Sequence, residues 1–372
     1  MRKILAVAAA AALALSLSAC GRDTGTPATG GSASGAVAAV KGTIGVAMPT
    51  KTSERWIKDG DYIKQQLEAA GYKVNLQYAN DDIPTQVTQV NDMVTKNNQV
   101  LVIASIDGTA LGPVLQTAKS KGINVIAYDR LINGTENVDY YATFDNYKVG
   151  QLQGEFIKEK IASMNKPVNL EPFAGSPDDN NAKFFFSGAW DVLNPLVKSG
   201  EIVVPSGKAP ATNDAWTSIG IQGWGSDTAQ SEMQNRLNSF YAGGKKVNVV
   251  LSPNDSLALG IAQALEGAGY KPGPDYPILT GQDADKANVL NIIAGKQAMT
   301  VWKDTRTLGD QVAKMVDQIV KGQKVEVNDE KTYDNGKKVV PTYLLPPVVV
   351  TKDDIKAKLV DSGFYTASDL GL

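Results

Sequence analysis

The 372-residue sequence has no histidine and only one cysteine, Cys20. Without histidine, the chain cannot use imidazole for acid–base catalysis or as a metal ligand. One cysteine forms no internal disulfide and supplies no cysteine-cluster metal site. A calcium loop of the D-x-[DN]-x-[DN]-G type is also missing. We therefore expect no structural metal and no cofactor.

The sequence also has no large excess of positive or negative charge, because it contains 37 basic and 39 acidic residues. No strongly basic segment points to nucleic acid as a partner. The sequence also lacks a G-x-S-x-G nucleophile elbow, a Walker loop and a Rossmann fingerprint, which argues against the enzyme classes that use them. What remains is the composition of a soluble globular protein, 43% apolar, with a length that predicts about two domains.

The amino terminus has the features of an export signal. Arg2 and Lys3 precede an apolar run of about a dozen residues, too short for an ordinary membrane span. The stretch Leu17–Gly21 resembles a bacterial lipobox, in which the cysteine thiol takes a diacylglyceryl group. The alternative is an ordinary cleavage site beside an unused cysteine. Because the only cysteine occupies the lipobox position, we expect residues 1–19 to be a signal peptide and Cys20 to be lipidated.

Residues 20–40 are rich in Gly, Ala, Ser and Thr and bury little, so they are typical of a flexible tether. The folded part should begin near Lys41. These features place the protein outside the cytoplasm, on the outer face of the cell membrane, with its lipid anchor as the only membrane contact.

From Thr43 onward, short apolar strands alternate with amphipathic helices through most of the chain. This alternation predicts right-handed βαβ units in parallel, doubly wound sheets. The pattern restarts after Phe144, which gives two halves of the same kind. The tail carries a hairpin-turn signal at Asn335-Gly336 and a strand-like segment over 342–350.

One strand is followed by an abrupt pair of charges. Residues 123–128 are suited to a strand buried on both faces, and Asp129-Arg130 comes directly after it. A salt-bridged pair at a strand end is one interpretation. Ligands bind beyond the carboxyl ends of strands in open α/β sheets, however. Other strands also end in polar residues at Asn254, Asp283 and Lys303, which favours a binding cleft at this edge.

Eight motifs follow one another along the chain, namely Met48–Trp56, Ile103–Thr109, Ala127–Leu131, Ala142–Asn146, Gly175–Asn181, Leu251–Asp255, Gly281–Asp285 and Val301–Thr305. In this order they resemble the sugar-binding proteins of ABC importers, closest to the xylose-binding and ChvE-type multiple monosaccharide-binding branch. The resemblance covers essentially the whole chain after the tether.

The resemblance implies the type I periplasmic binding protein fold, two doubly wound α/β domains joined by a three-strand hinge. The chain would cross near Asp145, return near Asp283 and cross again near Lys324. The N-terminal domain would then comprise 41–145 plus 284–324, and the C-terminal domain 146–283 plus 325–372. A sugar would lie in the cleft between them.

The resemblance also implies the sugar contacts. They are Lys51, Arg55, Trp56, Asp129, Arg130, Asp179, Asn181, Trp224, Asn254, Asp283 and Lys303. The chemistry is suitable, because every sugar hydroxyl both donates and accepts, and tryptophan rings pack on the C–H faces of a sugar. Helix capping is an alternative for residues 178–181, and both roles are compatible. We expect Trp190, Trp216 and Trp302 to be core residues, and Asp107 and Asp255 to be capping or supporting residues.

Two rival functions use related features. A glycosidase also places carboxylates around a sugar, but a cation or amide near each of Asp129, Asp179 and Asp283 should keep them ionised and unsuited to general-acid work. A sugar-responsive repressor would need an amino-terminal helix-turn-helix, and residues 1–40 are a signal and tether instead.

The predicted function is capture of a monosaccharide, of the xylose, glucose, galactose and arabinose class, and its delivery to an ABC importer permease. A sugar sensor that docks on a membrane receptor or chemoreceptor is a compatible alternative. We expect a monomer and no enzymatic activity. The sequence does not distinguish a pentose from a hexose ligand, because that choice depends on packing in the pocket.

Overall fold

The computed structural model describes residues 41–273 and 275–372. The predicted signal peptide, the lipidation site Cys20 and the tether that ends at residue 40 lie outside these residues. Within the described part of the chain, no helix is both long and apolar enough to cross a membrane.

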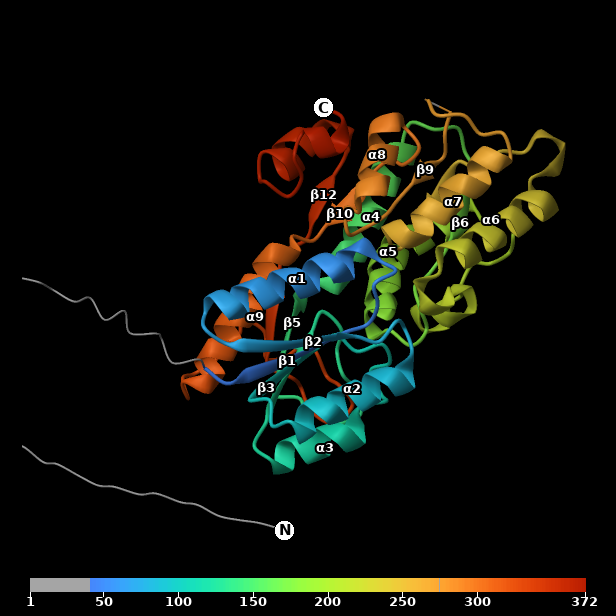
Figure 1. Ribbon diagram of the computed structural model, residues 1–372. Coiled ribbons are helices and arrows are strands. Elements are labelled where there is room, and N and C mark those ends of the chain that lie inside the picture. The colour runs from blue at the N-terminus through green and yellow to red at the C-terminus, as the bar shows by residue number, and fades with distance from the viewer. Residues whose placement is uncertain (1–40, 274) are drawn as a thin grey trace, which may run out of the picture. The chain divides into compact units, whose positions relative to one another are not determined.

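The first sheet has six parallel strands in the order β11-β5-β4-β3-β1-β2. Figure 1 shows α1 and α9 on one face of this sheet and α2 and α3 on the other. Successive side chains of a strand point to opposite faces, so Ile44 and Val46 pack toward α1 and α9 while Ala47 packs toward α2 and α3. The elements are β1 (Thr43–Met48), α1 (Glu54–Ala69), β2 (Lys73–Tyr78), α2 (Ile83–Thr95), β3 (Val100–Ile103), α3 (Gly112–Ser120), β4 (Asn124–Tyr128), β5 (Tyr140–Phe144), α9 (Thr305–Val320) and β11 (Thr342–Leu345).

The second sheet has the parallel order β7-β6-β8-β9, with α4 and α5 packed on one face and α6 and α7 on the other. Backbone hydrogen bonds extend it to β10, because Val301 N donates to Gly281 O at 2.9 Å. The elements are α4 (Asn146–Ile161), β6 (Val168–Pro172), α5 (Asn180–Lys198), β7 (Ile202–Val203), α6 (Ser226–Phe240), β8 (Val249–Leu251), α7 (Asp255–Gly267), β9 (Ile278–Leu279), α8 (Lys286–Ala294) and β10 (Thr300–Trp302).

We call the first sheet with α1, α2, α3 and α9 the first lobe, and the second sheet with β10, β12 and α4 to α8 the second lobe. The predicted alternation of strands and helices is therefore present in both halves. The strand predicted over 123–128 is observed as β4, which begins one residue later.

The tail differs from the prediction of one strand over 342–350. It forms two strands, β11 in the first sheet and β12 (Val348–Val350), which pairs antiparallel with β10. Pro346 and Pro347 separate them, because proline has no N–H to donate to a strand ladder. Residues 325–372 are thus divided between the lobes rather than belonging to the second domain as expected.

The crossings between lobes also need correction. The chain leaves the first lobe at Asp145, but it does not return near Asp283, because α8 contacts α7 and β10 extends the second sheet. The return comes at Lys303, before α9 packs against α1. The last crossing is at Pro346-Pro347 and not near Lys324, since β11 still belongs to the first sheet. Asp145 N donates to Leu345 O at 3.0 Å, so two crossings lie side by side.

Candidate functional site

A cavity of about 470 Å³ lies between the lobes, at the carboxyl ends of strands from both sheets. Its size is within the range of small-molecule sites. The structure brings ten of the eleven predicted contacts to its wall, namely Arg55, Trp56, Asp129, Arg130, Asp179, Asn181, Trp224, Asn254, Asp283 and Lys303.

Lys51 is the predicted contact that does not line the cavity. It is exposed, and its Nζ lies 4.8 Å from the centroid of the Tyr78 ring. Thr50, Thr52 and Ser53 of the loop after β1 line the cavity instead, as does Glu54 at the start of α1. Residue spacing along a loop does not determine which side chain faces inward, so this position was wrongly assigned to the cavity wall.

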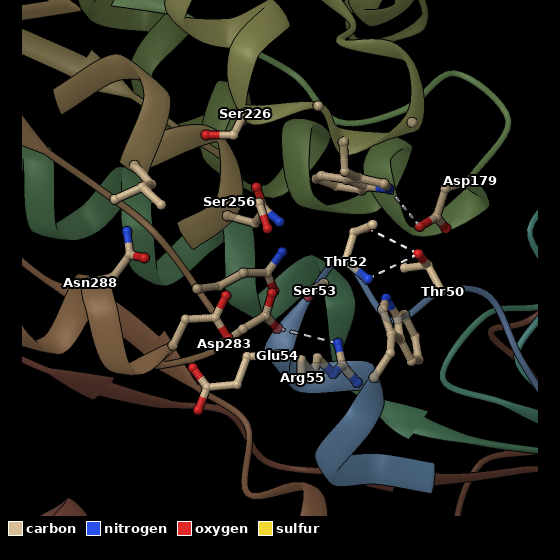
Figure 2. Close-up of a pocket in the computed structure, with 18 of the residues that line it drawn as sticks. Thr50, Thr52, Ser53, Glu54, Arg55, Asp179, Ser226, Ser256, Asp283 and Asn288 are labelled. Carbon is tan, nitrogen blue, oxygen red and sulfur yellow. Dashed lines mark hydrogen bonds and ion pairs between the residues drawn. The ribbon is translucent and has the colours of Figure 1, made fainter. Parts of the chain in front are cut away.

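Arg55 is surrounded by three carboxylates. Its guanidinium pairs with Asp129, lies 3.2 Å from Oδ1 of Asp283 and lies 3.5 Å from Oδ2 of Asp59. Figure 2 shows the contact with Asp283 from the second lobe. Burial opposes the charge of Arg55, but the carboxylates outweigh it and raise its pKa. The guanidinium is therefore held permanently charged and fixed in position.

Asp129 directly follows β4 and is nearly fully buried. Burial alone would raise its pKa, but Arg55, Lys303 and Arg130 outweigh burial and hold the pKa below its ordinary value. Its backbone has φ of 58°, a left-handed conformation that aspartate tolerates better than most residues. Asp129 is thus an ionised hydrogen-bond acceptor at the cavity wall.

Arg130 pairs with Asp179, whose Oδ2 lies 2.9 Å from Nε of Arg130. Asp179 is the N-cap of α5 and accepts from Asn181 N at 2.9 Å. It also accepts from Trp224 Nε1 at 3.2 Å. Asp179 therefore both caps the helix and lines the cavity, as the sequence allowed.

The pKa of Asp179 is shifted in the direction opposite to the one we expected. We expected a nearby cation to hold this carboxylate ionised, but burial outweighs Arg130 and raises the pKa. Asp285, which the sequence did not single out, also lines the cavity, and burial and Asp283 raise its pKa to about 7. The charge argument against a glycosidase therefore does not hold for Asp179.

Aromatic side chains line both lobes. Two guanidiniums lie near the Trp56 ring, with Arg55 4.7 Å and Arg130 4.9 Å from its centroid. Trp224 packs edge-on against Phe185 at 6.3 Å. Gly175 is required behind Trp224, because a Cβ there would lie 2.0 Å from the ring. These contacts fix the rings as apolar walls.

Lys303 and Asn254 complete the polar wall. Lys303 is 1% exposed, and its Nζ lies 2.9 Å from Oδ1 of Asp283. Asn254 is the N-cap of α7, and its side-chain oxygen accepts from Leu257 N at 3.0 Å. The amide nitrogen of Asn254 can therefore still donate hydrogen bonds. Ser256 lies on the same turn of α7. Figure 2 shows Ser256, Ser226 and Asn288 on the second-lobe side.

The other assigned residues have the expected structural roles. Trp190, Trp216 and Trp302 are buried in core clusters. Asp107 caps its own turn, with Thr109 N and Oγ1 both donating at 2.7 Å. Asp255 is fully buried and accepts from Gln297 Nε2 at 2.8 Å and from Thr300 Oγ1 at 3.0 Å.

Sequence reasoning missed several cavity residues. Phe185 lies one helical turn after Asn181, so the helical period would have found it. Asn288 lies one turn after Asp285 in the same way, and Gln282 belongs to a motif already singled out. In residues 41–273 and 275–372, no group of three or more His, Cys, Asp or Glu side chains is placed to hold a metal ion.

Comparisons with known proteins agree with this geometry. A family profile described as periplasmic binding protein domain matches residues 44–324. The chain is 52% identical to the multiple sugar-binding periplasmic receptor ChvE of Rhizobium radiobacter, over 90% of this chain and 94% of the relative. It is 37% identical to the D-xylose-binding periplasmic protein of Escherichia coli, over 88% of this chain and 92% of the relative.

A similar solved structure is an ABC transporter solute-binding protein from Clostridium phytofermentans with bound β-D-glucose. It has a TM-score of 0.84 and 52% sequence identity, and the match covers 88% of this chain and 99% of that one.

Proposed function

Because the chain belongs to the periplasmic binding protein family, we propose that it captures a free monosaccharide in the cavity between its lobes and delivers it to an ABC importer. The observation that carries the proposal is the composition of the cavity wall. It combines three buried cations, several carboxylates and three aromatic rings from both lobes. The named sugars of its relatives, glucose and xylose among them, indicate the aldose class.

The proposed direct contacts follow from the free hydrogen-bonding capacity at the wall. Asp129, Asp179 and Asp283 accept from sugar hydroxyls, while Arg55, Arg130, Lys303 and Asn254 donate to them. Hydrogen bonds to charged groups are stronger than neutral ones. Because these groups already pair with one another, they are oriented before a sugar arrives, which lowers the entropic cost of binding. Trp56 and Trp224 cover apolar faces of the ring.

We further propose that the two lobes are the two domains and that they close on the sugar about the crossings at Asp145, Lys303 and Pro346. A ligand bound by both lobes favours the closed state by its differential affinity. The proposed lipid at Cys20 keeps the domain at the outer face of the membrane, close to a permease, and the protein acts as a monomer.

The proposed activity is binding without chemical change. The raised pKa values of Asp179 and Asp285 make a direct test necessary. Calorimetry of residues 41–372 against glucose, galactose, xylose and arabinose should show binding of at least one sugar. The same protein, incubated with these sugars and their aryl glycosides, should return them unchanged. Absence of any sugar binding, or sustained turnover, contradicts the proposal.

A sensor role is the second candidate, because the Rhizobium radiobacter relative is named a receptor. In that role the closed, sugar-bound form docks on a membrane receptor. Deletion of the protein distinguishes the roles: loss of growth on a sugar indicates import, whereas loss of a sugar response with normal growth indicates sensing.

A further inference from the structure

We propose that Tyr365, near the C-terminal end of the chain, positions Asp283 in the cavity wall by holding the turn that carries it. We call residues 281–285 the Asp283 turn. The inference rests on the proposed sugar-binding function, in which Asp283 accepts hydrogen bonds from sugar hydroxyls. It assigns part of the sugar affinity to a tyrosine that is not itself among the residues lining the cavity.

The Asp283 turn has an unfavourable backbone conformation. Asp283 has a φ of 99° and Ala284 a φ of 55°, so two consecutive residues other than glycine lie in the left-handed region. Residues keep such a conformation only where the surrounding structure holds them. The conformation also decides where the Asp283 carboxylate lies, with Oδ1 3.2 Å from Arg55 and 2.9 Å from Lys303. The contacts that hold the turn therefore determine the position of a proposed sugar contact.

Two of these contacts come from within the second lobe and bind amide hydrogens. Asp255 Oδ2 accepts from Asp285 N at 3.0 Å, and Thr300 Oγ1 accepts from Ala284 N at 3.2 Å. The Thr300 hydroxyl in turn donates to Asp255 Oδ2 at 3.0 Å. Neither residue donates to the carbonyl oxygen of Ala284, which needs a donor of its own because a buried carbonyl without a partner is unfavourable.

Tyr365 supplies that donor. Its Oη donates to Ala284 O at 2.9 Å, and this oxygen accepts from no other residue that the structure describes. Tyr365 Oη itself accepts from Lys58 Nζ at 2.9 Å. Because a lysine ammonium only donates, the single hydroxyl hydrogen of Tyr365 remains for Ala284. Burial and the nearby Glu54 carboxylate raise the pKa of Tyr365, so the hydroxyl keeps its hydrogen.

The ring of Tyr365 is held in place from both lobes. It is 6% exposed and belongs to a core cluster with Trp302 and with Val289 of α8. Figure 1 shows the C-terminal segment beside α8. Phe364 packs edge-on against Tyr365 at 4.9 Å, and Nζ of Lys58, from α1 of the first lobe, lies 4.2 Å from the Tyr365 ring centroid. The hydroxyl therefore reaches the Asp283 turn in one fixed direction.

Loss of this hydroxyl leaves the Ala284 carbonyl without its donor and lets the turn relax. The Asp283 carboxylate is then in its binding position for only part of the time, and apparent affinity falls by that fraction. A tyrosine with a purely structural role has a different signature, because its loss lowers stability and leaves the affinity of the folded protein unchanged. The effect of Tyr365 should also disappear when Asp283 is truncated, since Tyr365 acts through it.

The test is a double-mutant cycle of Tyr365→Phe and Asp283→Ala, with calorimetric dissociation constants for a sugar that the wild type binds. Tyr365→Phe should weaken binding about three- to tenfold. In the presence of Asp283→Ala, the same change should weaken binding by less than about twofold. Asp283→Asn, which tolerates the left-handed backbone better, replaces Asp283→Ala if the latter fails to fold or binds too weakly to measure.

Tyr276→Phe is the matched control. Tyr276 is a buried tyrosine of the second lobe that is not among the residues lining the cavity, and its Oη donates to Ala262 O at 3.4 Å. Removal of its hydroxyl should leave the sugar affinity at the wild-type value, whatever the change in stability measured by urea denaturation.

Wild-type affinity of Tyr365→Phe overturns the inference. So does an equal loss of affinity on Tyr365→Phe with and without the Asp283 substitution, because Tyr365 would then act by another route. Wild-type affinity of the Asp283 variant overturns it too, since the contact that Tyr365 positions would be missing. A wild type that binds no sugar contradicts the proposed function instead, so the two failures are distinguishable.

Discussion

Nε of Arg130 lies 2.9 Å from Oδ2 of Asp179, which joins the residue after a first-lobe strand to the N-cap of a second-lobe helix. Both side chains are more than nine-tenths buried. Removing one partner of a buried ion pair leaves the other charge without compensation, which costs more than the pair contributes. The two lobes are therefore electrostatically matched at the cavity.

This pairing predicts strong coupling between the two residues in sugar binding. Arg130→Met should weaken binding by at least tenfold, because it removes a donor and leaves Asp179 unpaired. Adding Asp179→Asn to Arg130→Met should cost less than Asp179→Asn alone. Calorimetry on the four proteins of the cycle should give a coupling of at least ~1 kcal/mol. Additive effects would contradict the pairing.

Closure on the ligand should be visible in solution. Sugar contacts on both lobes favour the closed state, so saturating sugar should reduce the radius of gyration measured by small-angle scattering. Asp129→Ala at the same sugar concentration is the control, and its radius should stay at the ligand-free value. An unchanged radius in the wild type, with binding confirmed by calorimetry, would argue against closure.

Asp129 should be among the most costly positions to truncate. Asp129→Ala removes one or two charge-assisted hydrogen bonds of about 1.5–3 kcal/mol each, so binding should weaken by about one to three orders of magnitude. Asp107→Ala is the matched control, because Asp107 caps Thr109 and should affect stability more than affinity. If Asp129→Ala binds within about threefold of the wild type, Asp129 is not a direct contact.

Asp59 should make stability depend on pH. It is fully buried beneath the cavity, and burial, only partly offset by Arg55, raises its pKa from 3.8 to about 6. The folded state thus binds the proton more tightly than the unfolded state, and this stabilisation is lost as the pH rises from about 4 to about 6. The shift corresponds to at most about 3 kcal/mol.

Asp59→Asn should therefore show a smaller fall in the free energy of unfolding between pH 4 and pH 7, measured by urea denaturation. Asp61→Asn changes an exposed carboxylate on the same helix and should keep the wild-type profile. Parallel profiles for Asp59→Asn and the wild type would show that Asp59 does not titrate in this range.

Cys20 should determine membrane association. Cys20→Ser removes the thiol that we propose accepts the lipid, so the variant should move from the membrane fraction to the soluble exported fraction and lose label from a metabolically incorporated fatty acid. Ser32→Ala, in the predicted tether, should remain with the membrane. A Cys20→Ser protein that fractionates like the wild type would exclude the anchor.

The regular elements were accessible from the sequence because apolar periodicity determines them. The strand predicted over 123–128 differs from β4 by one residue, and the capping role of Asp107 followed from the Gly-Thr after it. The break between β11 and β12 at Pro346-Pro347 could also have been predicted, because adjacent prolines interrupt a strand ladder. It was missed because the flanking residues are all apolar and favour one continuous strand.

The sequence was less informative about which side chains face the cavity and how their pKa values shift, because both depend on burial in the folded structure. Lys51 and Glu54 are only three residues apart, yet Glu54 lines the cavity and Lys51 does not. The direction of the Asp179 pKa depends on how much burial opposes Arg130, which no spacing encodes. The hydrogen bond from Asn181 Nδ2 to Asp129 O likewise joins residues that are distant in sequence.

The double proline has a consequence for how motion of the lobes can be observed. Pro346 and Pro347 carry no amide hydrogen, so this crossing is silent in hydrogen–deuterium exchange and in amide NMR spectra. The neighbouring crossing is not silent, because the amide of Asp145 is protected by its bond to Leu345 O. The exchange rate of the Asp145 amide therefore reports how often these two crossings separate, and its measurement needs no label on the chain.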